Sequence, residues 1–180
     1  MRNTALVRRG IETVTFLFAA FSGFLKNVAP PDEIHPGFAT GTASFAVLAL
    51  LLFVSSLRPG GAKSIRRGRW LTVGMLLLAT SLASSVIYTV ILERYTFAYP
   101  PEGIRSTYVR GAGYTSAAAR LASEGLAPSA IVAKFGGLQN RELVWSPESL
   151  QRARAILLVS YLTMVLAIAA AVFCFLEARS

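Results

Sequence analysis

The stretch WLTVGMLLLATSLASSVIYTVIL, residues 70–92, decides the fold of this chain. It contains no charged side chain. A helix rises 1.5 Å per residue, so about 20 residues cross the roughly 30 Å hydrocarbon core of a bilayer. The length and composition of this stretch therefore predict a membrane-spanning helix.

The same stretch is unusual because its segment TSLASSVIYT, residues 80–89, is rich in hydroxyl groups. At helical spacing these groups form two adjacent stripes, Ser81, Ser85 and Thr89 in one and Thr80, Ser84 and Tyr88 in the other. Small and hydroxyl residues allow helices to pack closely and bond to one another. A stripe of hydroxyls also suits the lining of a water-filled pore. The six residues are thus candidates for pore lining, with helix packing as the alternative.

Three further apolar segments, at about 11–29, 38–57 and 155–176, accompany residues 70–92. Charged residues make up 15% of the chain, against about 25% in soluble proteins. Glu12 and the lack of an A-x-A site favour a retained first helix over a cleaved signal peptide. We therefore predict an all-α membrane protein with four transmembrane helices and a small helical domain inserted between helices 3 and 4.

The charges of the short connecting segments predict the orientation. The N-terminal MRNTALVRRG and the segment RPGGAKSIRRGR, residues 58–69, are basic, whereas NVAPPDEIHPG, residues 27–37, contains no Lys or Arg. Basic residues collect in cytoplasmic loops. This pattern predicts a multi-pass protein of the cell inner membrane with both termini in the cytoplasm, and it places residues 94–153 outside.

The segment from 94 to 146 has the signals of a small soluble domain. Residues 93–115, rich in Tyr, Pro and Gly, predict an irregular or partly extended connector. Thr115 or Ser116 can cap a short helix that ends at Gly125, and Pro128 can begin a second one that ends at Gly136 and Gly137. The chain offers only enough apolar groups for a miniature core, Leu121, Leu126, Ile131, Val132, Phe135 and Leu138.

The final segment, residues 147–180, predicts one long helix. Ser146, Pro147 and Glu148 form a strong start signal, and no helix breaker follows before Leu176. Such a helix has about 30 residues and is roughly 45 Å long. It would exceed the bilayer, with its transmembrane part at about 155–176.

The segment ARLASEGLAPSAIVAKFGGLQNREL, residues 119–143, resembles the first two helices of a resolvase-type helix-turn-helix. The resemblance implies that a polar recognition helix should follow. The sequence instead continues as RELVWSPES, and Pro147 interrupts it. We therefore expect no sequence-specific DNA binding.

The basic residues suggest a different ligand. The chain carries a net charge of +9. In and after the small domain, side chains that can contact the phosphates of a nucleotide or oligonucleotide are Arg110, Arg120, Lys134, Arg141, Arg152 and Arg154. The alternative is that these side chains are solvated or reach toward lipid headgroups.

Catalytic and metal-binding patterns are missing from the sequence. His35 is the single histidine and Cys174 the single cysteine. Asp32, Glu33 and His35 share one short loop, and an enzyme would have to be built on that loop. Without a second His or Cys nearby, a zinc site is not expected. We predict no enzyme activity, no cofactor and no metal.

In size, number of spans and small basic domain, the layout resembles the small multi-span effectors of bacterial antiphage defence systems. The resemblance implies a homo-oligomeric ion channel whose small domain senses a nucleotide signal or a partner. It also implies a cytoplasmic sensing domain, which conflicts with the orientation predicted from the charges. The alternative is a membrane anchor or accessory subunit that binds another envelope protein.

Overall fold

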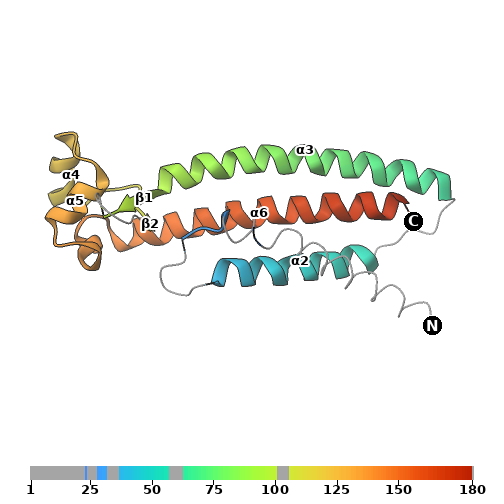
Figure 1. Ribbon diagram of the computed structural model, residues 1–180, viewed down its shortest axis with the longest axis horizontal. Coiled ribbons are helices and arrows are strands. Elements are labelled where there is room, and N and C mark those ends of the chain that lie inside the picture. Colours follow the sequence, from blue (N-terminus) through green and yellow to red (C-terminus); the bar gives the residue numbers. More distant parts are fainter. Residues whose placement is uncertain (1–22, 24–27, 32–36, 57–62, 101–105, 180) are drawn as a thin grey trace. The chain divides into compact units, whose positions relative to one another are not determined.

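The computed structural model describes residues 23, 28–31, 37–56, 63–100 and 106–179. The first predicted transmembrane helix, at about 11–29, lies almost wholly outside these residues, as do Asp32, Glu33 and His35. The described part is mostly helical and contains α2 (Phe38–Ser56), α3 (Lys63–Tyr95), β1 (Thr96–Tyr99), β2 (Ser106–Val109), α4 (Ser116–Ser123), α5 (Pro128–Lys134), the 3-10 helix η1 (Leu138–Leu143) and α6 (Pro147–Arg179) (Figure 1).

Two of these helices are long and apolar enough to cross a membrane. The segments are Gly68–Tyr95 in α3 and Pro147–Ala178 in α6. In α2 the apolar helical segment is shorter, Phe38–Leu50. Four transmembrane helices are therefore not supported by the described residues, which hold two helices of sufficient length and composition.

The chain divides into two compact units. One contains Met1–Ile87 and Ser160–Ser180, and the other contains Tyr88–Val159. The boundaries fall inside α3 and α6, so each long helix contributes residues to both units. The second unit, called the small domain below, includes the predicted segment 94–146 together with one end of each long helix.

In the first unit, the beginning of α3 packs against the end of α6. The ring of Trp70 meets the ring of Phe173 edge to face, with 6.1 Å between centroids. Gly74 lies so close to α6 that a Cβ atom there would be 3.2 Å from the Cβ of Cys174 and 3.3 Å from the ring of Phe175. The two helices therefore run antiparallel, and Gly74 allows their close approach.

In the small domain, a two-stranded antiparallel sheet precedes the short helices. β1 pairs with β2 in a register that sets Thr96 opposite Val109 and Tyr99 opposite Ser106. The predicted connector is thus partly extended, as expected. The sheet corrects the all-α prediction, because the β-branched and aromatic residues of TFAY and STYV suit a pleated strand better than an irregular loop.

The short helices begin and end where the sequence predicts. The Thr115 side chain accepts a hydrogen bond from the backbone N–H of Ala118 at the start of α4. Gly125 follows α4 with φ of +82°, a left-handed conformation that glycine adopts without strain. Pro128 occupies the first turn of α5. The hydroxyl of Ser146 accepts from the N–H of Ser149, so the start signal of α6 is confirmed.

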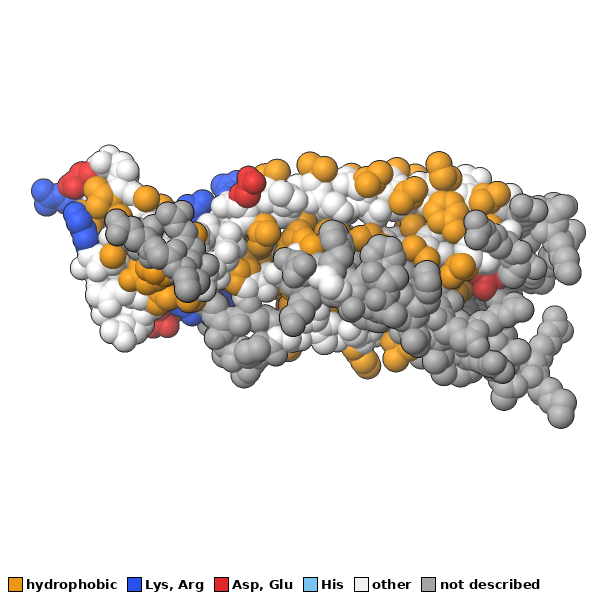
Figure 2. All heavy atoms as spheres, viewed as in Figure 1, with side chains coloured by type: hydrophobic (Ala, Val, Ile, Leu, Met, Phe, Trp, Pro, Cys, Tyr) orange, Lys and Arg blue, Asp and Glu red, His pale blue; other side chains and the backbone are white. Residues whose placement is uncertain are grey.

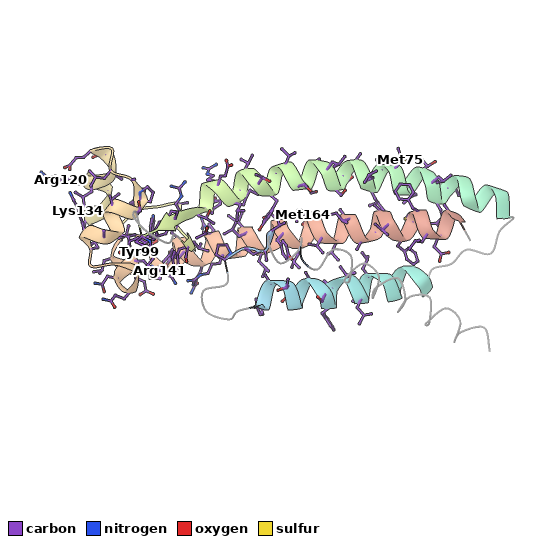
Figure 3. All side chains as sticks on the ribbon, viewed as in Figure 1. Met75, Tyr99, Arg120, Lys134, Arg141 and Met164 are labelled. Carbon is purple, nitrogen blue, oxygen red and sulfur yellow. The ribbon has the colours of Figure 1, made fainter. Side chains whose placement is uncertain are left out.

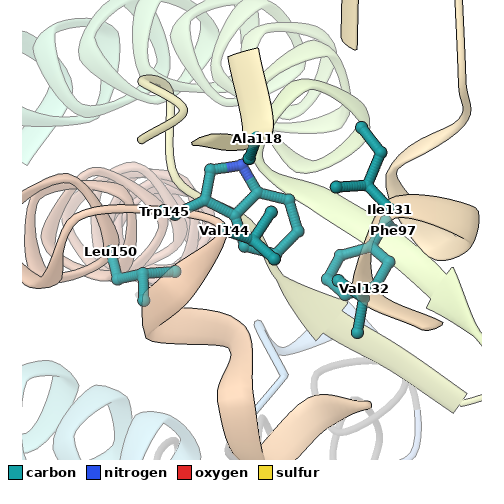
Figure 4. Packing of buried hydrophobic residues seen from close by; sticks show 7 residues of the cluster. All are labelled: Phe97, Ala118, Ile131, Val132, Val144, Trp145 and Leu150. Atoms are coloured by element: carbon teal, nitrogen blue, oxygen red, sulfur yellow. The ribbon is translucent and has the colours of Figure 1, made fainter. Parts of the chain in front are cut away.

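The predicted miniature core is present but incomplete. Ile131 and Val132 are buried, and the other four predicted residues are half-buried against them. The prediction missed five residues that complete the buried cluster, Phe97, Ala118, Val144, Trp145 and Leu150 (Figure 4). These residues come from β1, from α4, from the two residues after η1 and from α6. The β-strand and the long helix thus supply much of the core.

Candidate functional site

The hydroxyl residues of α3 do not share one exposed face. Ser81 is only 3% exposed and Tyr88 is fully buried. Ser84 and Ser85 are half-buried, whereas Thr80 and Thr89 are exposed. The buried and half-buried members, at spacings of three and four, lie on the face of α3 that is covered within this chain. Of the six predicted lining residues, Thr80 and Thr89 are therefore the ones left on the surface.

Several of these hydroxyls bond to the backbone of their own helix. The Ser81 Oγ donates to the carbonyl of Leu78 at 2.8 Å, and the Ser85 Oγ donates to the carbonyl of Ser81 at 2.8 Å. The exposed Thr80 Oγ1 donates to the carbonyl of Leu76 at 3.0 Å. A hydroxyl bonded in this way does not need water, so it is tolerated in apolar surroundings. This arrangement favours helix packing for Ser81; pore lining stays a prediction.

The outer surface of α3 is apolar along its length. Its large exposed hydrophobic side chains are Leu71, Val73, Met75, Leu76, Leu78, Leu82, Val86, Ile87 and Val90. Figure 2 shows hydrophobic side chains spread along this helix. Exposed apolar surface of this extent is rare on soluble monomers and marks contact with lipid or with other proteins.

The six basic candidates do not form one site. Arg120, on α4, and Lys134, on α5, are exposed (Figure 3). Arg141, in η1, is half-buried. The other three, Arg110, Arg152 and Arg154, lie where β2 and the first turns of α6 meet the end of α3.

The two exposed basic side chains on the short helices, Arg120 and Lys134, are weakly constrained. The Arg120 Nε lies 3.7 Å from a carboxylate oxygen of Glu124, and the two side chains are 87% and 51% exposed. An ion pair this exposed contributes little to stability. Arg120 and Lys134 are therefore available to a partner in water.

The most constrained part of the small domain surrounds Trp145, which is fully buried. Its ring lies 5.2 Å from that of Phe97 and 5.8 Å from that of Tyr114, between centroids. Within the described residues the indole Nε1 finds no hydrogen-bond partner, and Figure 4 shows it beside Ala118. Its burial without a partner costs free energy, so the apolar and ring contacts of Trp145 must outweigh that cost.

Two connections fix the segment that carries Trp145. Thr115 donates its hydroxyl to the carbonyl of Leu143 at 2.6 Å and its N–H to the carbonyl of Val144 at 2.9 Å. Gly111 lies against the first turn of α6, where a Cβ atom would be 2.5 Å from the Ser149 Oγ. Sequence reasoning missed this centre. The available signal was a lone tryptophan directly before the start of a helix.

Metal-ligating side chains do not gather in the described part of the chain. Across residues 37–56, 63–100 and 106–179, no group of three His, Cys, Asp or Glu side chains is arranged to hold a metal ion. The loop of Asp32, Glu33 and His35 lies outside the described residues. The absence of enzyme activity stays a prediction.

Comparison of the chain with protein-family models, with curated proteins and with solved structures gives no match.

Proposed function

We propose that this chain is an integral membrane protein that holds a small recognition domain in water at the membrane surface. The observation that carries this proposal is the continuity of α3 and α6. Each helix contains a segment of bilayer length, Gly68–Tyr95 or Pro147–Ala178, and each also packs into the small domain. A partner bound by the domain is thereby tethered to the bilayer.

The apolar surface of α3 supports placement in lipid. Burying apolar surface contributes about 25 cal/mol per Å². Exposing side chains such as Met75, Leu76 and Leu82 to water would forgo that gain, whereas lipid is as apolar as the side chains themselves. In this placement α3 needs to pack on the rest of the chain along one face only, because lipid covers its other faces.

For orientation, we propose that the basic segment around the start of α3 lies in the cytoplasm. This segment contains Lys63, Arg66, Arg67 and Arg69. The small domain lies at the other end of the same helix. In a multi-pass protein of the inner membrane, the positive-inside rule then places the domain on the outer face.

For the partner, we propose another envelope protein with an acidic surface. Arg120 and Lys134 are exposed on adjacent short helices, and Arg120 has only a weak, solvated contact with Glu124. Long-range attraction between such basic groups and an acidic patch speeds association. The proposed protein is a non-enzymatic anchor or accessory subunit.

A homo-oligomeric channel, including a defence effector that senses a nucleotide signal, stays the second proposal. The uncovered face of α3 provides a surface where further copies can pack. A pore built on that face would present mainly apolar side chains, with Thr72, Thr80 and Thr89 as exposed hydroxyl residues. A cytoplasmic nucleotide signal would also require the opposite orientation of the small domain.

Cysteine labelling tests the membrane placement. In a Cys174→Ala background, single cysteines would replace Ser123 in the small domain, Leu82 in α3 and Gly68 near the basic end. We expect a membrane-impermeant maleimide to label Ser123→Cys in spheroplasts and Gly68→Cys only after permeabilisation. Leu82→Cys should stay unlabelled because lipid surrounds it.

Rapid labelling of Leu82→Cys from water, or release of the wild-type chain by alkaline carbonate, would disprove the membrane proposal. Labelling of Gly68→Cys in intact spheroplasts and of Ser123→Cys only after permeabilisation would reverse the orientation and leave the anchoring intact.

Affinity purification from native membranes tests the recognition role. We expect a stoichiometric envelope protein to accompany the wild type and to be lost from an Arg120→Glu/Lys134→Glu variant at equal expression. A matched Glu124→Gln variant should keep the partner. Retention of the partner by the charge-reversed variant would exclude this surface as the binding site.

A further inference from the structure

Four arginines lie at one level of the small domain, where the two long helices enter it. The end of α3 packs against the start of α6 and β2 in a cluster formed by Ile91, Leu92, Tyr95, Val109, Ala153 and Leu157. The arginines next to these residues in sequence come from the two long helices and from the position directly after β2, and they are Arg94, Arg110, Arg152 and Arg154. Contact among their neighbours therefore brings the four to one level, called the arginine belt below.

Hydrogen bonds join two members of this belt. The Arg110 Nε donates to the carbonyl of Arg94 at 2.7 Å, and the Arg110 N–H donates to the carbonyl of Tyr95 at 2.8 Å. The Arg94 guanidinium lies 6.0 Å from the centre of the Tyr95 ring. Backbone and side-chain contacts thus fix Arg110 beside Arg94.

The charge at this level is positive. Arg94 and Arg152 are exposed, while Arg110 and Arg154 are half-buried. Among the described residues, the acidic ones closest to the belt in sequence are Glu93 and, four residues before Arg152, Glu148. The gathered guanidinium groups favour an external anion beside the exposed Arg94 and Arg152.

We propose that the arginine belt binds the phosphate groups of anionic phospholipids. This inference rests on the proposed membrane insertion, because the uncharged stretches of both long helices border the belt. Residues 70–92 end two residues before Arg94, and residues 155–176 begin directly after Arg154. The planar guanidinium group pairs with phosphate through two parallel hydrogen bonds. Tyr95, half-buried at the same level, suits the headgroup region, where an aromatic ring with a polar tip is favoured.

The small domain also provides a matched control. Arg120 and Lys134 carry the same total charge as Arg94 and Arg152 and are likewise exposed. They lie on α4 and α5, whose neighbouring residues do not include an apolar segment of bilayer length. If the belt binds the lipid, replacement of Arg120 and Lys134 should leave the lipid preference of the chain unchanged.

The test measures lipid preference with the purified full chain. The chain would be reconstituted into bilayers of phosphatidylglycerol and phosphatidylcholine in equal amounts, then analysed by native mass spectrometry for retained lipid. We expect the wild type to retain phosphatidylglycerol preferentially. Each arginine near the membrane surface contributes about fivefold to the binding of anionic lipid. The preference of an Arg94→Gln/Arg152→Gln variant should therefore be lower than that of the wild type by a factor on the order of 25. An Arg120→Gln/Lys134→Gln variant should keep it.

Further variants and conditions make each outcome informative. An Arg94→Lys/Arg152→Lys variant keeps the positive charge but loses the paired hydrogen bonds, so it should retain only part of the preference. Equal loss in the belt and control variants, or a wild type inserted in the bilayer without lipid preference, would overturn the proposal. Competition by millimolar inorganic phosphate would assign the belt to a soluble phosphate compound and also overturn it. A wild type that does not enter bilayers at all contradicts the proposed function instead.

Discussion

The helices α3 and α6 have the same length, 33 residues each, but they are packed differently. In the most apolar stretch of each helix, 11% of the residues of α3 are buried, compared with 44% of those of α6. Both helices are long and apolar enough to cross a bilayer. The difference shows that two helices of equal length that both meet this hydropathy criterion can be packed differently, one largely enclosed and the other exposed to its surroundings.

The largest expected effect compares one leucine on each helix. Leu157 of α6 is fully buried, whereas Leu82 of α3 is 64% exposed. Leu157→Ala should lower the free energy of unfolding by about 2–5 kcal/mol, because it leaves a cavity. Leu82→Ala should change it by less than about 0.5 kcal/mol, because lipid or detergent fills the space. Unfolding by SDS in mixed micelles measures both, and equal losses would contradict the assigned burial.

The next effect concerns the close approach at Gly74. Gly74→Leu should destabilise the chain by about 1–3 kcal/mol, because its side chain would collide with Cys174 and Phe175 of α6. Gly68→Ala provides the control, since a Cβ atom there meets nothing within 4 Å. The same unfolding experiment measures both variants. A Gly74→Leu variant as stable as the wild type would disprove the packing of α3 on α6.

A disulfide gives the same contact a chemical test. In Gly74→Cys the new Cβ would lie 3.2 Å from the Cβ of Cys174, close to the roughly 3.5–4.5 Å of disulfides. We expect mild oxidation to remove both thiols from maleimide labelling, as measured by mass. In the control variant Met75→Cys, the new cysteine is exposed and lies one residue further along α3. Its thiol and that of Cys174 should both remain available to maleimide after oxidation. Cross-linking of Met75→Cys instead would place the wrong face of α3 against α6.

The smallest expected effect separates the hydroxyls of α3 by their burial. If α3 lines a channel, a Thr80→Val/Thr89→Val variant should reduce depolarisation of cells that express the chain. Ser81→Ala should leave the membrane potential of those cells near that of the wild type, because its hydroxyl is buried and bonded to its own helix. A potential-sensitive dye at matched membrane levels measures both. If the wild type and both variants all fail to depolarise the cells, the result would favour the proposed membrane anchor over a channel.

Local sequence signals located most of the described helix boundaries. Thr115 caps α4, Pro128 begins α5 and Ser146 caps α6, because each of these signals acts through atoms within one helical turn. The long helix of residues 147–179 follows for the same reason, since no breaker interrupts it. The number of spans is compared less fully, because the first predicted span, at about 11–29, lies almost wholly outside the described residues and the described apolar segment of α2 ends at Leu50.

The sequence by itself determined the two long apolar helices, the short capped helices between them and the excess of positive charge. Only the tertiary structure decided that β1 and β2 pair, that Trp145 is the centre of the small domain and that Ser81 and Tyr88 are buried. Tertiary structure also joined Arg94 to Arg110, sixteen residues away. The physical reason is range: caps and hydropathy act between near neighbours, whereas burial and charge clustering depend on residues that meet only after the chain has folded.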